Sequence, residues 1–181
     1  MSFNKSLPEA VEKAKKVKMV LFDVHGVLTD NTVIYDDEGR RLRAFCHEDG
    51  FGCNALMFCG IEVSVITRKS KSVAARMEDL GIKRYYETKE KIPQYEKLLE
   101  ELGITDEEVC YVGDEVIDVG VMQRVGFAVA PSDAKPQALE VADFVTEKAG
   151  GNGVARELAE FILKTQDKWE TFMEKVMQKG W

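Results

Sequence analysis

Residue types that often mark a metal centre or a disulfide framework are scarce in this sequence, which has two histidines and four cysteines among 181 residues. No two cysteines have CxxC spacing, and neither histidine has metal-ligand spacing to a cysteine pair. We therefore interpret Cys46, Cys53, Cys59 and Cys110 as reduced thiols. A zinc site is the alternative interpretation, but it needs several such ligands at close spacing.

Long apolar runs, a secretion signal and an excess of positive charge are also missing. No stretch reaches the ~20 residues that span a bilayer, and the N-terminus lacks the pattern of a signal peptide. We therefore expect a cytoplasmic protein with no membrane partner. The net charge of -7 argues against nucleic acid as the main partner, although local basic clusters can still hold a small phosphate.

The composition that is present, 45% hydrophobic and 31% charged, suits one globular domain with a buried core. Apolar stretches of strand length alternate with longer stretches of helical period. This alternation predicts an α/β fold, a Rossmann-like parallel sheet flanked by helices on both faces. We expect a single domain over residues 1–181 with a β-hairpin at about 32–45 and a helical tail at about 154–181.

Individual elements can be placed along the chain. Two short segments, 32–35 and 42–45, flank the turn Asp36-Asp-Glu-Gly39 and predict the hairpin. Residues 166–181 carry apolar side chains at helical spacing, which indicates either a helix packed on its own domain or a segment that reaches a neighbouring subunit. The predicted strands are 18–22, 61–66, 84–86, 109–113, 127–129 and one near Phe144; the predicted helices are 9–16, 49–59, 70–80, 89–102, 116–125, 135–141 and one from Val154.

Carboxylates follow two of the predicted strands. Asp23 ends the apolar run 18–22, and Asp114 ends the run 109–113. In open α/β sheets the carboxyl ends of the strands line the crevice where ligands bind. Two carboxylates brought together there repel each other unless a hard cation lies between them, and Mg²⁺ with oxygen ligands suits that position.

Three further residues extend this predicted site. A carboxylate beside Mg²⁺ can attack a phosphate ester to give an aspartyl-phosphate, which water then hydrolyses. Thr67 supplies a hydroxyl and Lys91 a cation that can hold the non-bridging oxygens. Simpler readings stay open: a strand-end hydroxyl for Thr67, an exposed lysine at a helix start for Lys91, and a helix cap or solvated carboxylate for Asp118.

The order of these residues resembles the motifs of the haloacid dehalogenase superfamily. The segment Asp23-Val-His-Gly-Val-Leu-Thr-Asp30 resembles its first motif, Thr67 the second, Lys91 the third, and Gly113-Asp-Glu-Val-Ile-Asp118 the fourth. The hairpin and residues 45–52, 111–122 and 149–157 resemble a capless subgroup that hydrolyses sugar-acid phosphates such as 3-deoxy-D-manno-octulosonate 8-phosphate.

The resemblance implies a Mg²⁺-dependent phosphatase with Asp23 as nucleophile and metal ligand. It adds the backbone carbonyl of His25 and the side chain of Asp114 as ligands, with Asp118 supporting the metal shell, and places Thr67 and Lys91 on the phosphoryl group. It also implies a homotetramer assembled by the hairpin, which helps to close a neighbour's active site, and a role in lipopolysaccharide biosynthesis.

Basic residues near the predicted site are candidates for substrate binding. Arg40, Arg41 and Arg43 lie on or near the hairpin, and Arg68 directly follows Thr67. Two interpretations are open: a cationic rim that attracts an anionic sugar acid, and solvated charges that protect a strand edge from aggregation.

The sequence departs from the family pattern most clearly at His25, where the family's phosphatases carry the aspartate that protonates the leaving alkoxide and then activates water. Imidazole can perform both steps, so a phosphatase with His25 as acid/base is expected. The alternative is a catalytically impaired member that acts by binding or as an oligomeric partner. Further departures are Glu115 in place of an aspartate and Asn152 in place of a basic residue. After Thr67 the loop is either one residue short or has Arg68 in place of a glycine.

Overall fold

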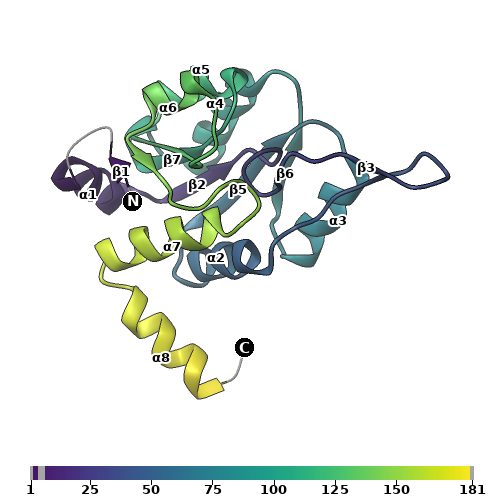
Figure 1. The fold of residues 1–181 in the computed structure, drawn as a ribbon. Helices are drawn as coiled ribbons and strands as arrows, with labels where there is room; N and C mark the ends of the chain where they lie inside the picture. Colours follow the sequence, from purple (N-terminus) through teal and green to yellow (C-terminus); the bar gives the residue numbers. More distant parts are fainter. Residues whose placement is uncertain (1, 4–6, 180–181) are drawn as a thin grey trace.

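A mixed β-sheet runs through the centre of the protein (Figure 1). The computed structural model describes residues 2–3 and 7–179. Within these residues the sheet has the order β1-β9-β8-β7-β2-β5-β6, with all neighbours parallel except the β1–β9 pair. The strands are β1 (Ser2–Phe3), β2 (Met19–Phe22), β5 (Glu62–Thr67), β6 (Arg84–Glu87), β7 (Val109–Val112), β8 (Phe127–Ala130) and β9 (Phe144–Val145).

Helices cover both faces of the sheet, which confirms the predicted α/β class (Figure 1). Strands β2, β7 and β8 are buried throughout because each is covered on both sides, as expected for central parallel strands. One face packs against α1 (Leu7–Lys16), α2 (His47–Phe58), α3 (Lys71–Asp79) and α7 (Val154–Thr165); the other packs against α4 (Lys91–Leu102), α5 (Val119–Met122) and α6 (Pro136–Val141).

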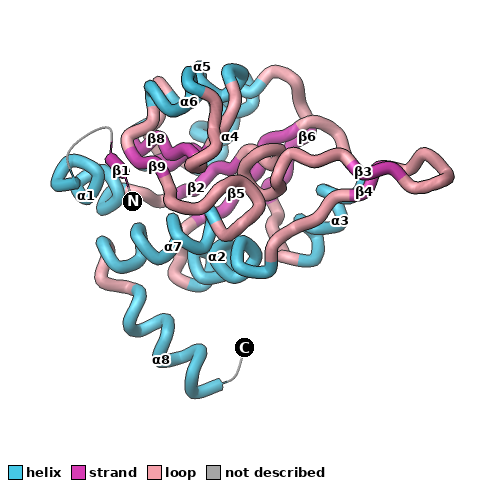
Figure 2. The backbone as a smooth tube through the Cα atoms, viewed as in Figure 1, coloured by secondary structure: helices cyan, strands magenta, loops and turns pink. Residues whose placement is uncertain are grey.

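The predicted hairpin is present but shorter than expected, and it projects from the body of the protein (Figure 2). It pairs only β3 (Ile34–Tyr35) with β4 (Arg41–Leu42). The carboxylate of Asp36 organises the turn by accepting hydrogen bonds from the backbone N–H groups of Glu38 and Arg40. In the described part of the chain no third strand pairs with β3 or β4. Because an isolated two-stranded hairpin is only marginally stable, the flanking residues of the predicted strands do not extend the pairing.

Two other differences concern short elements. The helix predicted over 116–125 is a 3-10 turn, η2 (Val116–Asp118), followed by the short helix α5. The carboxylate of Asp118 accepts hydrogen bonds from the backbone N–H groups of Asp114 and Glu115, which tightens this first turn. The strand β1 and the 3-10 turn η1 (Asp106–Glu108) were not predicted, because two or three residues carry no readable periodicity.

The C-terminal helix α8 (Trp169–Lys179) packs one apolar side on its own domain, while Met177 is 71% exposed, so both interpretations of the tail stay open. Its Trp169 and Phe172 are buried, and the Phe172 ring contacts Phe51 and Phe58 of α2 with centroid distances of 5.7 and 5.5 Å. Trp181, the last apolar residue of the predicted tail, lies outside the described residues.

No described helix combines the length and the apolar character that crossing a membrane would require. The cysteines named above are free thiols, and Cys53 and Cys110 are buried in the core. The position of the candidate site follows instead from the order in which the chain visits the strands of the sheet.

The path of the chain places a crevice at the centre of the sheet. From β2 the chain moves outward through β5 to β6, then crosses by α4 to β7 on the other side of β2. The loops that leave β2 and β7 therefore diverge at their carboxyl ends, which is the topological switch point where α/β folds bind ligands.

Candidate active site

Asp23 lies at this switch point, directly after β2, and is buried together with a cation. The Nζ atom of Lys91 donates hydrogen bonds to Asp23 Oδ1 at 2.7 Å and to Asp118 Oδ1 at 2.6 Å. Lys91 is the first residue of α4, where the helix dipole disfavours a positive charge, so the two carboxylates must compensate for both burial and position. The prediction of an exposed Lys91 is wrong, since only 7% of this residue is accessible.

Asp118 is fully enclosed at the end of η2, so the reading of a solvated carboxylate is also wrong. Its Oδ1 atom accepts hydrogen bonds from Lys91 and from the Tyr111 hydroxyl, the latter at 2.5 Å. Its Oδ2 atom accepts from the backbone N–H groups of Asp114 and Glu115. A carboxylate offers about four acceptor sites, so these four donors fill Asp118. This arrangement suits support of a metal shell better than direct ligation.

Asp114 completes an acidic cluster. Asp23, Asp114 and Asp118 each place a carboxylate oxygen within 4.8 Å of the others. Gly26 makes room for Asp114, because its φ of +85° and a Cβ only 2.0 Å from Asp114 Oδ2 would both oppose a larger residue. The Oδ1 atom of Asp114 is buried and has no hydrogen-bond partner.

The charges of this cluster do not balance by themselves. Three carboxylates face the single ammonium of Lys91, which leaves two negative charges in excess when all are ionised. Burial and the neighbouring carboxylates raise the pKa of Asp114 to about 7, and burial, with Asp118, raises the pKa of Asp23 to about 6 against the opposing pull of Lys91. Burial alone would lower the pKa of Lys91, but Asp23 and Asp118 outweigh it and the pKa is raised.

A divalent cation fits this site. Its two charges would cancel the excess, and the unpartnered oxygen of Asp114 together with Asp23 provides the hard oxygen ligands that Mg²⁺ prefers. The chemistry of the donor set therefore agrees with the metal that the sequence predicts.

A cavity of about 300 Å³ opens above Asp23. Besides Asp114 Oδ1, two donor atoms of residues in its wall are buried without a hydrogen-bond partner, the Thr67 hydroxyl and the Arg43 Nε atom. Unpartnered buried donors are rare in folded proteins and mark places where a ligand completes the bonding. The cavity is lined by Asp23, His25, Asn31, Val33, Arg41, Arg43, Thr67, Arg68, Lys69, Lys91, Asp114, Glu115 and Ile117.

The rim of the cavity is basic, and the structure separates the predicted arginines. Of the four candidate arginines, Arg41, Arg43 and Arg68 line the same cavity as Asp23. Arg40 is directed elsewhere, because its guanidinium pairs with Asp36 and Glu38 in the hairpin turn. Arg40 therefore does not contribute to the cationic rim of the cavity.

His25 also lines the cavity. Burial lowers the pKa of its imidazole to about 4, and the positive charges of Arg43, Lys91 and Arg68 act in the same direction. The imidazole therefore rests in its neutral form in this arrangement.

Two other departures from the family pattern have simple local roles. Glu115 lines the cavity and its side chain accepts a hydrogen bond from the Val116 backbone N–H, which caps η2. The Asn152 amide donates to the Gly150 carbonyl at 2.8 Å within its own loop.

Tyr111 was missed as a site residue. It lies in β7 with its ring fully buried, and its hydroxyl contacts both Lys91 and Asp118. The signal available in the sequence was weak: one side chain with a polar end within an apolar strand, three residues before Asp114.

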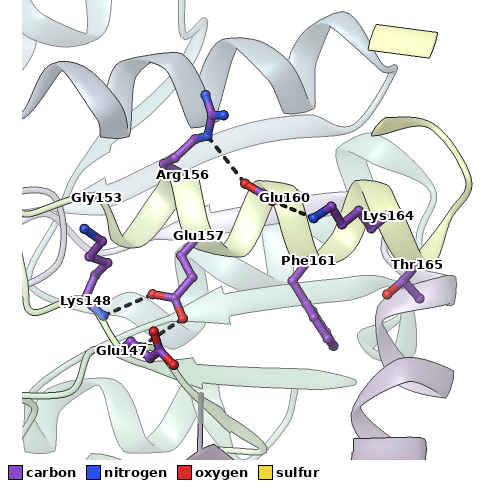
Figure 3. Close-up of a pocket in the computed structure, with 9 residues that line it drawn as sticks. All are labelled: Glu147, Lys148, Gly153, Arg156, Glu157, Glu160, Phe161, Lys164 and Thr165. Atoms are coloured by element: carbon purple, nitrogen blue, oxygen red, sulfur yellow. Dashed lines mark hydrogen bonds and ion pairs between the residues drawn. The ribbon is translucent and has the colours of Figure 1, made fainter. Parts of the chain in front are cut away.

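A second cavity along α7, of about 510 Å³, lacks this chemistry (Figure 3). Its acidic side chains are engaged locally: Glu160 pairs with Lys164 at 2.6 Å, and Glu157 accepts hydrogen bonds from the backbone N–H groups of Glu147 and Lys148. The Glu157 contacts hold α7 against the preceding loop and the Glu160–Lys164 pair lies within the helix, so the larger cavity is the weaker candidate.

Comparisons with known proteins agree with the site. The family model of haloacid dehalogenase-like hydrolases matches residues 67–158. The 3-deoxy-D-manno-octulosonate 8-phosphate phosphatase KdsC of Salmonella typhimurium is 40% identical over 163 residues, which cover 89% of this chain and 87% of that protein.

Two solved structures have the same fold. A Legionella pneumophila protein assigned to subfamily III A of the haloacid dehalogenase hydrolases superimposes with a TM-score of 0.92 at 42% identity, covering 96% of each chain. The 3-deoxy-D-manno-octulosonate 8-phosphate phosphatase of Moraxella catarrhalis, in complex with magnesium ion, phosphate ion and KDO, gives a TM-score of 0.91 at 35% identity. That match covers 94% of this chain and 99% of the Moraxella chain.

Proposed function

This chain belongs to the haloacid dehalogenase-like hydrolases and is a phosphatase, and from that premise we propose that it hydrolyses the phosphate monoester of an anionic sugar acid. The observation that carries the proposal is the buried set of Asp23, Lys91 and Asp114 beneath a cavity whose Thr67 hydroxyl lacks a partner. The relatives named for 3-deoxy-D-manno-octulosonate 8-phosphate make that compound the first substrate to test.

The first step of the proposed reaction forms a covalent intermediate. A carboxylate oxygen of Asp23 attacks phosphorus, the bond from phosphorus to the sugar oxygen breaks, and the alkoxide takes a proton from solvent. The Thr67 hydroxyl and the Lys91 ammonium hold the non-bridging oxygens as negative charge builds on them. Asp23, Asp114 and the carbonyl of His25, with Asp118 in support, would hold a Mg²⁺ ion, which when bound would supply Lewis-acid stabilisation of the phosphoryl charge.

The second step regenerates Asp23. Water attacks phosphorus, the bond between phosphorus and the Asp23 oxygen breaks, and inorganic phosphate leaves. We assign the proton of the attacking water to His25, because it lines the cavity together with Asp23 and because burial, with the nearby positive charges, keeps its imidazole neutral and so free to accept a proton. His25 then returns this proton to solvent, so that one water is consumed for each ester.

Arg43 and Arg68 are the proposed contacts for the carboxylate of the sugar acid. Both line the cavity, and guanidinium groups match carboxylates in a bidentate geometry. Kinetics of Arg43→Gln and Arg68→Gln distinguish this role from general electrostatics. KM should rise for a sugar-acid phosphate and stay nearly constant for an aryl phosphate that has no carboxylate. An equal change for both substrates would contradict it.

The hairpin is the proposed site of assembly into a homotetramer. Val33, Ile34, Tyr35 and Leu42 are all about half exposed, and apolar residues clustered on a projecting hairpin commonly mark an interface. Light scattering on the wild-type protein and on Ile34→Ser, Tyr35→Ser tests the assembly. A monomeric wild-type protein would contradict it. A single domain acting in the cytoplasm, in lipopolysaccharide biosynthesis, completes the proposal.

Removal of the metal is expected to stop the reaction. A phosphate-release assay on a panel of sugar-acid and aryl phosphates should show activity with Mg²⁺, highest kcat/KM for 3-deoxy-D-manno-octulosonate 8-phosphate, and none with EDTA. Because Mg²⁺ binds only the folded protein, it should also stabilise the fold by about 2.7 kcal/mol at 100 times its Kd. Thermal unfolding with and without Mg²⁺ measures this second effect. Inactivity on every ester with Mg²⁺ present would overturn the proposed function.

Substitution of His25 tests its assignment as the base that accepts the proton of the attacking water. His25→Ala is expected to lower kcat about 100-fold or more, because the attacking water loses its proton acceptor. Since the first step is spared, rapid-quench measurements should show a burst of about one equivalent of alcohol followed by slow turnover.

The matched variant is His25→Asp, which restores a carboxylate at this position and should remain active. A wild-type-like kcat for His25→Ala would show that His25 carries no proton. If the wild-type protein is inactive and only His25→Asp turns over, the chain is instead a catalytically impaired member.

A further inference from the structure

The Tyr111 hydroxyl is connected to the predicted nucleophile Asp23 through the ammonium of Lys91. Its side chain is fully buried in β7, so the hydroxyl depends on protein partners for its hydrogen bonds. It has two: it accepts from Lys91 Nζ at 3.1 Å and donates to Asp118 Oδ1 at 2.5 Å. Tyr111, Lys91 and Asp118 therefore form a closed triangle of hydrogen bonds.

This triangle determines where the ammonium of Lys91 can point. An ammonium group has three N–H donors, and here they go to Asp23, Asp118 and Tyr111. Asp118 and Tyr111 hold two of the donors on the side away from the cavity. The third donor faces Asp23, where the proposed reaction places the phosphoryl group.

Loss of the Tyr111 hydroxyl would leave one buried donor of Lys91 and one side of Asp118 unpaired. A buried unpaired donor is costly, so the ammonium would turn toward Asp118, whose Oδ1 atom has lost the Tyr111 donor, and away from Asp23, where it meets a phosphoryl oxygen. We propose that Tyr111 is a positioning residue for the hydrolysis, which fixes Lys91 and Asp118 so that the ammonium meets the phosphoryl group as its charge grows. This inference rests on the proposed function, because it assigns Lys91 to the phosphoryl oxygens.

A matched control exists within the same core cluster. Tyr95 is also fully buried, and its hydroxyl donates to Asp106 Oδ1 at 2.5 Å, a carboxylate remote from the cavity lining. Tyr111→Phe and Tyr95→Phe each remove one hydroxyl that is bonded to a carboxylate and keep the ring that fills the core. Both variants should therefore fold, with the larger loss of stability in Tyr111→Phe because its hydroxyl has two buried partners, whereas only Tyr111→Phe should affect the chemistry.

The test compares these variants in steady-state kinetics and in the binding of orthovanadate with Mg²⁺, measured by calorimetry. Orthovanadate mimics the five-coordinate phosphoryl group, so its Kd reports the positioning of Lys91 independently of turnover. Tyr111→Phe should raise the vanadate Kd and lower kcat about tenfold each, with KM changed less than about twofold. Tyr95→Phe should leave all three within about twofold, and circular dichroism should show both variants folded.

A double variant guards against a purely structural effect. In a Lys91→Met background, Tyr111→Phe should change the vanadate Kd by less than about twofold, because the residue through which it acts is gone. An unchanged Kd in Tyr111→Phe, or an equal loss in both backgrounds, would overturn the inference. A wild-type protein that binds vanadate but hydrolyses no ester would instead contradict the proposed function, and the vanadate comparison would still decide the role of Tyr111.

Discussion

Replacement of Asp23 by asparagine is expected to abolish phosphate release, with kcat reduced by about 10⁴-fold or more. The neutral amide is a poor nucleophile toward phosphorus, so no covalent intermediate can form on it. Asp23 lies directly after β2, lines the cavity and pairs with Lys91. Among the described carboxylates it alone combines these two properties, because Asp118 pairs with Lys91 but does not line the cavity, and Asp114 lines the cavity but does not pair with Lys91. Phosphate release over hours, with highly purified protein, measures the residual rate.

The same substitution should not unfold the protein. In EDTA the wild-type cluster holds more carboxylates than cations, so removal of one negative charge relieves repulsion with Asp114 and offsets the loss of the Lys91 ion pair. Asp37→Asn, which changes an exposed carboxylate of the hairpin, is the matched control and should keep wild-type activity. Activity above about 1% in Asp23→Asn would exclude Asp23 as the nucleophile.

Replacement of Lys91 by methionine is expected to damage both chemistry and stability. Asp23 and Asp118 would then lose the ammonium with which both form ion pairs, and breaking a buried ion pair typically costs about 3–5 kcal/mol. Activity should fall about 10³-fold, because the phosphoryl oxygens lose a preorganised positive charge. Chemical denaturation in EDTA and phosphate-release kinetics measure the two effects separately.

The control for this variant is Lys89→Met, two residues earlier and exposed. It removes the same charge and should change the free energy of unfolding by less than about 0.5 kcal/mol. Mg²⁺ should recover part of the stability of Lys91→Met, since the added cation replaces some of the missing positive charge. Equal stability of the two variants in EDTA would show that Lys91 is not needed to balance the cluster.

Much of this site could be predicted because its residues follow features with a clear sequence pattern. Asp23 and Asp114 stand at the abrupt ends of apolar strands, and parallel strands necessarily bring such positions to one edge. Thr67 ends the next strand, and Arg68 follows it into the same cavity. Repulsion between two carboxylates then implied a cation, which the excess negative charge of the folded site supports.

Other features were not readable, because they depend on side-chain direction and on distant partners. Arg40 and Arg43 look equivalent in the sequence, yet one pairs with Asp36 in the turn and the other lines the cavity. The short hairpin strands have no neighbour to lengthen their pairing, and no local pattern records that absence in the described chain.

The sequence by itself determined the α/β class, the order of its long elements and the sheet edge at which Asp23 and Asp114 meet, because hydrophobic period and strand ends are local properties. Only the tertiary structure decided that Lys91 is buried, that Asp118 is saturated by four donors and that Tyr111 joins them. The Lys91 contacts to Tyr111, Asp118 and Asp23 join residues 20 to 68 positions apart and exist only after α4 and β7 pack against β2. The other three donors of Asp118 lie within seven residues of it, but their direction is set only by the folded loop after β7.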